Sequence, residues 1–164
     1  MKQAMVLLAL FSFTDLFAQE ASPGKTRFVL GLSGPELFHA GLTHRIGDFS
    51  QFGFSAGAGP SWGMIWTSIN LEHRLYLGKP SEKSNQKTYF FRQGSTFFPS
   101  ATESSRHFTV NLTVGKDFLF SKIRNGLTVD VGVFYLPDTE EASIMLIRSV
   151  NLAPALRFQF YFSL

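Results

Sequence analysis

One pair of residues in this 164-residue chain has the spacing of a catalytic dyad. His107 and Thr109 are separated by a single residue, and residues two apart on a β-strand share a face. A histidine within hydrogen-bond reach of a hydroxyl can activate it as a nucleophile. The nearest downstream acid is Asp117, but the sequence does not fix its position relative to this pair. The alternation of the segment turns His107 toward the polar side of the strand, and we predict no catalytic residue and no enzyme.

Metal and thiol chemistry are not indicated either. The chain contains no cysteine, so it has no disulfide, no thiolate nucleophile and no thiolate metal site. His39, His44 and His73 do not have the spacing of metal ligands, and we interpret them as interior or interface residues. We therefore expect no metal and no cofactor.

Binding of phosphate or nucleic acid also has little support. Gly53, Gly57 and Gly59 fall in a strand and turn context, where glycine relieves crowding, rather than in a phosphate-binding loop. The net charge is only +3, and the basic residues are scattered along the chain. Proteins that bind nucleic acid usually cluster these residues on one surface, so we predict no nucleic-acid partner.

The elements that carry these residues are predicted from alternation, which is strongest at the end of the chain. In 152–164 every second residue is apolar or proline, and the residues between them are polar or small. Period 2 over this length indicates a β-strand with different surroundings on its two faces. A strand of about 9–11 residues, tilted, crosses a lipid bilayer. The outward set is Leu152, Pro154, Leu156, Phe158, Phe160, Phe162 and Leu164, and the inward set is Ala153, Ala155, Arg157, Gln159, Tyr161 and Ser163.

The start of the chain has the pattern of an export signal. A lysine at the second position precedes an apolar stretch over 4–13, which is too short for a membrane-spanning helix. Leu16 and Ala18 fit the −3 and −1 positions of a cleavage site. We therefore predict a signal peptide at 1–19 and one domain at 20–164; the alternative is a buried N-terminal helix of a cytosolic protein.

Alternation recurs along the rest of the chain and predicts an all-β fold. No later stretch is long and apolar enough for a transmembrane helix, so a spanning structure would have to be a closed barrel. An even strand number is typical of bacterial barrels formed by one chain, and we predict an eight-stranded antiparallel up-and-down transmembrane β-barrel. The expected strands are 26–33, 37–46, 49–58, 63–77, 87–98, 106–119, 126–136 and 150–163.

The links between these strands sort into two ends. The turns at 47–48, 78–86 and 121–125 are expected at the end that holds both termini, and those at 34–36, 59–62, 99–105 and 137–149 at the other. In 87–98 the faces are not assigned, because Arg92 and Gln93 compete for the inside.

The polar faces contain charges of both signs. An eight-stranded barrel has an interior just wide enough to be filled by side chains. We therefore predict an interior network in which Arg45, Arg74 and Arg157 pair with Glu72 and Asp130, rather than an open conduit. A soluble carrier would invert the pattern, and the inward faces are rich in Gly, Ser, Thr and Ala, which suits a crowded interior. The charged residues that share the inward parity are Arg27, Arg45, Arg74, Arg157, Glu72 and Asp130.

Three stretches resemble the small outer-membrane β-barrel proteins of the porin-like type found in Bacteroidota. They are GLTHRIGDFSQFGFSAGAG (41–59), INLEHRLYLGKPSEKSNQKTYFF (69–91) and NLAPALRFQFYFSL (151–164). The last resembles the C-terminal strand that the barrel-assembly machinery recognises, although Ser163 and Leu164 follow the terminal aromatic residue, Phe162. The resemblance implies location in the outer membrane of a Gram-negative cell, contact with its lipid, and assembly by that machinery.

The function expected from this resemblance is a structural or surface-exposed role for a monomer with a filled interior. Three alternatives stay open: a small-solute or lipid-handling outer-membrane barrel, a secreted soluble ligand-binding β-barrel, and a lipid A-modifying hydrolase. Outer-membrane lipid A deacylases carry a His-x-Ser pair, which His107 and Thr109 resemble with threonine in place of serine. That chemistry needs the lipid face, whereas the alternation turns His107 inward.

Overall fold

The computed structural model describes residues 25–34, 37–61, 64–81, 86–99, 107–120, 125–135 and 152–164. The predicted signal peptide at 1–19 lies outside these residues. So do most residues of the links predicted at 34–36, 59–62, 99–105 and 137–149. The structure is all-β and has eight strands in the described part of the chain. They are β1 (Thr26–Ser33), β2 (Phe38–Ile46), β3 (Ser50–Ser61), β4 (Met64–Leu77), β5 (Tyr89–Phe98), β6 (His107–Leu119), β7 (Gly126–Tyr135) and β8 (Leu152–Ser163).

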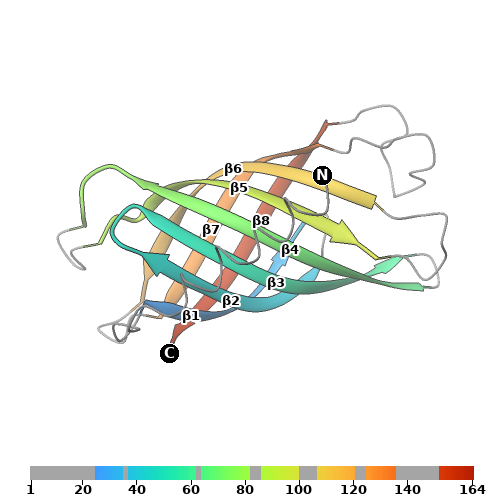
Figure 1. Cartoon of the computed structure of the whole chain (residues 1–164), viewed down its shortest axis with the longest axis horizontal. Coiled ribbons are helices and arrows are strands. Elements are labelled where there is room, and N and C mark those ends of the chain that lie inside the picture. The colour runs from blue at the N-terminus through green and yellow to red at the C-terminus, as the bar shows by residue number, and fades with distance from the viewer. Residues whose placement is uncertain are drawn as a thin grey trace, which may run out of the picture.

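The eight strands form one closed antiparallel barrel in sequence order, β1 to β8. Each strand pairs with the next, and β1 pairs with β8 through a register that runs from Arg27 opposite Ser163 to Ser33 opposite Arg157. Figure 1 shows the strands inclined around a common axis, with β1 beside the end of β8. Closure gives every strand two neighbours and removes the unpaired sheet edges that invite aggregation.

The alternation of polar and apolar residues in the sequence corresponds to a difference in exposure between the inner and outer faces of the barrel wall. Along β8 the burial alternates residue by residue, with Arg157 3% exposed and Phe158 43% exposed. The same holds in β7, where Asp130 is 1% exposed and Val131 is 56% exposed. For the strands whose faces were predicted, the described residues confirm the assignment: the charged side chains point into the barrel and most large apolar side chains point out. The interior also holds a few apolar side chains, among them Val29 and Phe90 at 2% exposure.

The predicted strand limits agree with the structure to within three residues. The largest difference is in β3, which was predicted to end at Ala58 and extends to Ser61. Beyond Ala58 this strand has lost its partner β2 and pairs only with β4. Pro60 therefore lies at a local edge, where a missing N–H is tolerated. The strand predicted at 87–98 begins at Tyr89.

The up-and-down order separates the links into two groups, as predicted. The links 47–49, 78–88 and 120–125 leave from the barrel end at which β1 begins and β8 ends. We call this end the terminal end, and the other end the distal end. Gly47 and Gly78 both have positive φ (63° and 78°) in links of the terminal end. Glycine adopts this backbone conformation without the steric cost that other residues pay.

Candidate functional site

The interior of the barrel gathers most of the buried polar groups. Glycine makes room for them at the level of Glu72, which lies between Gly53 and Gly94 in the pairing of three neighbouring strands. A Cβ added to Gly53 would lie 2.7 Å from the Glu72 Cγ. The prediction that glycine relieves crowding inside the barrel is confirmed at this position. The absence of a side chain on both sides lets the Glu72 carboxylate be surrounded by guanidinium groups.

Two carboxylates and three arginines form the central cluster. The carboxylate of Glu72 is 2.7 Å from Arg74 Nη2 and 3.6 Å from Arg92 Nη1, and it also pairs with Arg157. The carboxylate of Asp130 is 3.2 Å from Arg92 Nη2 and 2.8 Å from Arg157 Nε. All five side chains are at most 4% exposed. The predicted pairing of Arg74 and Arg157 with these acids is therefore confirmed.

A third buried acid, Asp117, organises the terminal end of the interior. Its carboxylate is 3.2 Å from Arg27 Nη1 and 3.8 Å from Arg74 Nη1. It also accepts hydrogen bonds from the Tyr76 and Thr128 hydroxyls, at 2.9 and 2.8 Å. Arg74 therefore links this terminal cluster to the central one. Because each acid is shared by several donors, the network offsets much of the cost of burying its charges.

The prediction for Arg45 is wrong. Its guanidinium contacts neither Glu72 nor Asp130, because Arg45 is the second-last residue of β2, close to the terminal end, whereas both acids lie deeper in the barrel. It donates instead to the Gln86 side-chain oxygen at 3.2 Å and to the Lys87 carbonyl at 3.1 Å. Arg45 thereby fastens the link 78–88 to the barrel wall.

The sequence left two interior residues, Arg92 and Asp117, without an assigned position. Arg92 is 4% exposed and points inward, whereas its neighbour Gln93 is exposed on the outside. Asp117 was left unplaced, although its even spacing from Thr113 on the same strand turns both residues to the same face. Asp117 is 4% exposed and Thr113 is 2% exposed. The alternation along β6 was therefore enough to assign Asp117 to the inner face. In β5 the adjacent polar residues Arg92 and Gln93 could each face inward, so alternation did not decide between them.

Nearer the distal end the interior is polar but uncharged. The Thr96 hydroxyl lies 2.9 Å from Asn70 Nδ2 and 3.1 Å from Asn111 Nδ2, and it accepts a hydrogen bond from each. All three residues are at most 4% exposed. These short side chains pack three neighbouring strands together without adding charge.

The structure does not bring Asp117 close to the pair His107 and Thr109. Thr109 is 1% exposed and points into the barrel. His107 is the first residue of β6 and pairs with Phe98, but its side chain lies outside the described part of the structure. Asp117 is eight residues beyond Thr109 on β6, roughly 26 Å away at about 3.3 Å per residue. It belongs to the terminal cluster and does not complete a triad with this pair.

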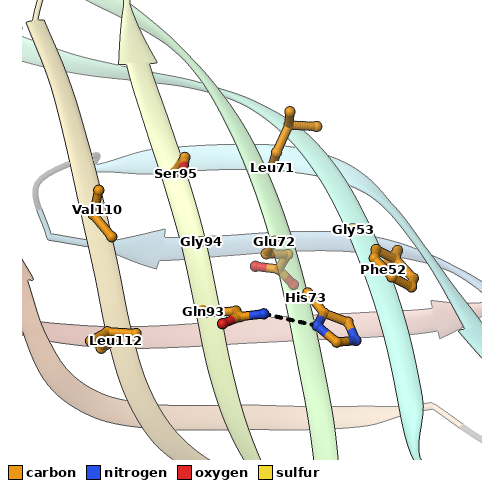
Figure 2. Close-up of a pocket in the computed structure, with 10 residues that line it drawn as sticks. All are labelled: Phe52, Gly53, Leu71, Glu72, His73, Gln93, Gly94, Ser95, Val110 and Leu112. Atoms are coloured by element: carbon orange, nitrogen blue, oxygen red, sulfur yellow. Dashed lines mark hydrogen bonds between the residues drawn. The ribbon is translucent and has the colours of Figure 1, made fainter. Parts of the chain in front are cut away.

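The outer surface carries a shallow groove of about 360 Å³ across β3 to β6 (Figure 2). Apolar side chains such as Leu71 and Leu112 line it, together with the backbone at Gly53 and Gly94. Figure 2 shows His73 and Gln93 side by side within it, joined by a 3.1 Å hydrogen bond between Gln93 Nε2 and His73 Nδ1.

His73 is otherwise held by its neighbours on β3. Its Nε2 is 2.8 Å from the Ser50 hydroxyl, and its ring stacks on Phe52 with 4.4 Å between centroids. These contacts hold the ring against the wall, which leaves the groove a mainly apolar surface with a small polar centre.

The other two histidines lie on β2, on opposite faces. His39 is in the interior, 4% exposed, with its Nε2 3.1 Å from Gln159 Nε2. His44 lies on the outer face, with its Nδ1 2.9 Å from the Thr26 hydroxyl. In the described part of the chain no three His, Asp or Glu side chains are grouped so that they could hold a metal ion.

Comparison with known proteins does not add a relative. No protein-family model, no curated protein and no solved structure matches this chain. Within the described ranges no helix is long and apolar enough to cross a membrane. The fold and the residues themselves therefore carry the functional argument.

Proposed function

We propose that this protein is an integral outer-membrane β-barrel with a side-chain-filled interior and a structural or surface-exposed role. The observation that carries the proposal is the distribution of residues across the wall. Charged side chains such as Arg74 and Asp130 are at most 2% exposed, whereas large apolar side chains cover the outside. Water is a poor solvent for such an outer surface, and lipid is a good one. A soluble carrier barrel would have the opposite arrangement.

The length of the strands fits a bilayer. β8 spans Leu152–Ser163, which at about 3.3 Å per residue and a tilt of about 40° covers roughly 28 Å along the barrel axis. The hydrocarbon core of a bilayer is about 30 Å thick. The exposed apolar residues of β8 therefore cover the distance that a membrane requires.

Aromatic residues gather at the terminal rim of the outer surface. Phe49, Tyr89 and Phe120 are 61%, 55% and 62% exposed there. The Lys87 ammonium lies 3.6 Å from the centre of the Phe49 ring, and the Lys116 ammonium 4.7 Å from that of Tyr89. Aromatic girdles with basic neighbours are typical of the boundary between lipid and water.

The filled interior supports a structural role rather than transport. The central cluster crosses the barrel, since Glu72 on β4 pairs with Arg157 on β8. Opening a water path would require separating buried charges that are shared among several partners, at a cost of several kcal/mol. The protein is therefore proposed to act through its fold and its surface. Export by the segment 1–19 and recognition of β8 by the barrel-assembly machinery complete the proposal, as in the Bacteroidota barrels that the sequence resembles.

Cell fractionation tests the location. The mature chain should sediment with outer membranes and require detergent for release, because its outer face is apolar. A chain that lacks residues 1–19 is the control and should remain in the cytoplasm. Recovery of the wild-type chain as a soluble periplasmic or secreted protein would contradict the proposal.

A further inference from the structure

The buried charges of the barrel do not balance. Among the buried side chains that the structure describes, five arginines accompany only three carboxylates, Glu72, Asp117 and Asp130. The two acids of the central cluster form ion pairs with three of these arginines. Asp117 forms ion pairs with Arg27 and with Arg74. The described interior thus carries an excess of positive charge, and the arginine that contacts no described carboxylate is Arg45.

At the terminal end, two of these arginines contact the same uncharged oxygen. The side-chain carbonyl oxygen of Gln86 is 3.3 Å from Arg27 Nη2 and 3.2 Å from Arg45 Nη1. Two guanidinium groups thus donate to an atom that carries only a partial negative charge. Such a fork of donors is the arrangement that proteins use for carboxylate and phosphate oxygens, where the bonds are shorter and stronger.

Aromatic rings hold both guanidinium groups in place. The Arg45 guanidinium carbon lies 3.9 Å from the centre of the Tyr76 ring, and that of Arg27 lies 4.4 Å from the centre of the Tyr161 ring. The side chains of Arg27 and Arg45 are nine-tenths or more buried. In addition, Arg27 Nε is buried and has no hydrogen-bond partner among the described residues. The donors are therefore fixed in position before any ligand arrives.

We propose that Arg27 and Arg45 form a binding site for a phosphate-type oxyanion at the terminal end of the barrel interior. The anion takes the place of the Gln86 side-chain oxygen between the two guanidinium groups. It supplies the negative charge that the described interior lacks. No covalent step is involved, and the site goes beyond the proposed structural role because it gives the barrel a ligand.

The proposal is tested with the full mature chain in non-ionic detergent, with inorganic phosphate as the probe. Phosphate should raise the midpoint of thermal unfolding saturably, compared with chloride at the same ionic strength, because it binds the folded state. Arg45→Gln should weaken phosphate binding by about tenfold or more, since a charge-assisted hydrogen bond is lost. Lys116→Gln is the control, because it removes a positive charge from the outside of the same end and should leave the phosphate response unchanged.

A second variant keeps the test decisive if Arg45→Gln does not fold. Gln86→Glu places a carboxylate between the two guanidinium groups, so it should raise the unfolding midpoint in chloride and abolish the phosphate response. A response in wild-type protein to free phosphate identifies a soluble anion. A response only in vesicles that contain phosphatidylglycerol identifies a lipid phosphate. If neither probe changes the midpoint, or if Gln86→Glu lowers it and keeps the response, the site does not exist.

Discussion

Glu72 pairs with three arginines of the central cluster, so its replacement gives a sharp stability prediction. The change is Glu72→Gln, which keeps the shape of the side chain and removes its charge. In the wild-type barrel the carboxylate contacts Arg74, Arg92 and Arg157. After the change Arg92 and Arg157 keep Asp130, and the only described carboxylate that Arg74 keeps is Asp117, at 3.8 Å. The positive excess of the described interior grows by one.

The size of the effect follows from burial and from what glutamine can still do. Removing one member of a buried ion pair costs about 3–5 kcal/mol, because an uncompensated charge remains. The amide oxygen of glutamine can still accept the hydrogen bond that Arg74 Nε makes to Glu72 Oε1 at 2.9 Å, which recovers about 1 kcal/mol. We therefore expect a loss of about 2–4 kcal/mol in the free energy of unfolding, a large share of a typical total of about 5–15 kcal/mol.

Reversible denaturant titration of the protein in lipid vesicles measures this loss. Asp48→Asn is the matched control, because it removes the same charge from an exposed turn residue and should change the free energy of unfolding by less than about 0.5 kcal/mol. If Glu72→Gln behaved like this control, the reasoning that the ion-pair network stabilises the interior would be refuted.

Three further predictions concern the wall, the packing and the lumen. Val131→Arg should lower the free energy of unfolding in lipid by about 2–4 kcal/mol, whereas Leu164→Arg at the end of the barrel should lower it by about 0–1 kcal/mol. Equal losses in the denaturant titration would argue against contact of Val131 with lipid. Gly41→Ala should have a much lower unfolding midpoint than Gly34→Ala. A Cβ at position 41 would lie 2.6 Å from the Ser55 Cα, whereas nothing lies within 4 Å of a Cβ at position 34. Similar midpoints for the two variants would contradict the close packing at Gly41. In planar bilayers the pure protein should show no large, stable single-channel conductance, and a steady ion-selective current would overturn the filled-lumen account.

The strand pattern and the two faces could be predicted from sequence because they depend on a local rule. Side chains alternate along a strand, so the inward position of Asp130 and the outward position of Val131 follow from their neighbours. The rule gave no assignment in β5, where Arg92 and Gln93 are adjacent and either could point inward. The register with β6 decides the matter, since Arg92 pairs with the inward-facing Thr113.

The partners of the interior side chains could not be predicted in the same way. Period 2 gives the face of a residue but not its height or its position around the barrel. Glu72 and Arg157 are 85 residues apart in the chain and meet only because the barrel closes. The misassigned partner of Arg45 has the same origin, since its height near the terminal end depends on the register between strands.

The most direct test of the central claim is a depth profile of spin labels along the outer face of β8. The chain has no cysteine, so single cysteines at Leu152, Leu156, Phe160 and Leu164 can each carry one label in vesicles. We predict that access to oxygen is highest at Leu156 and Phe160, and that access to a water-soluble nickel chelate is highest at Leu152 and Leu164, because the strand crosses the bilayer. High nickel access at all four positions would contradict a barrel embedded in lipid.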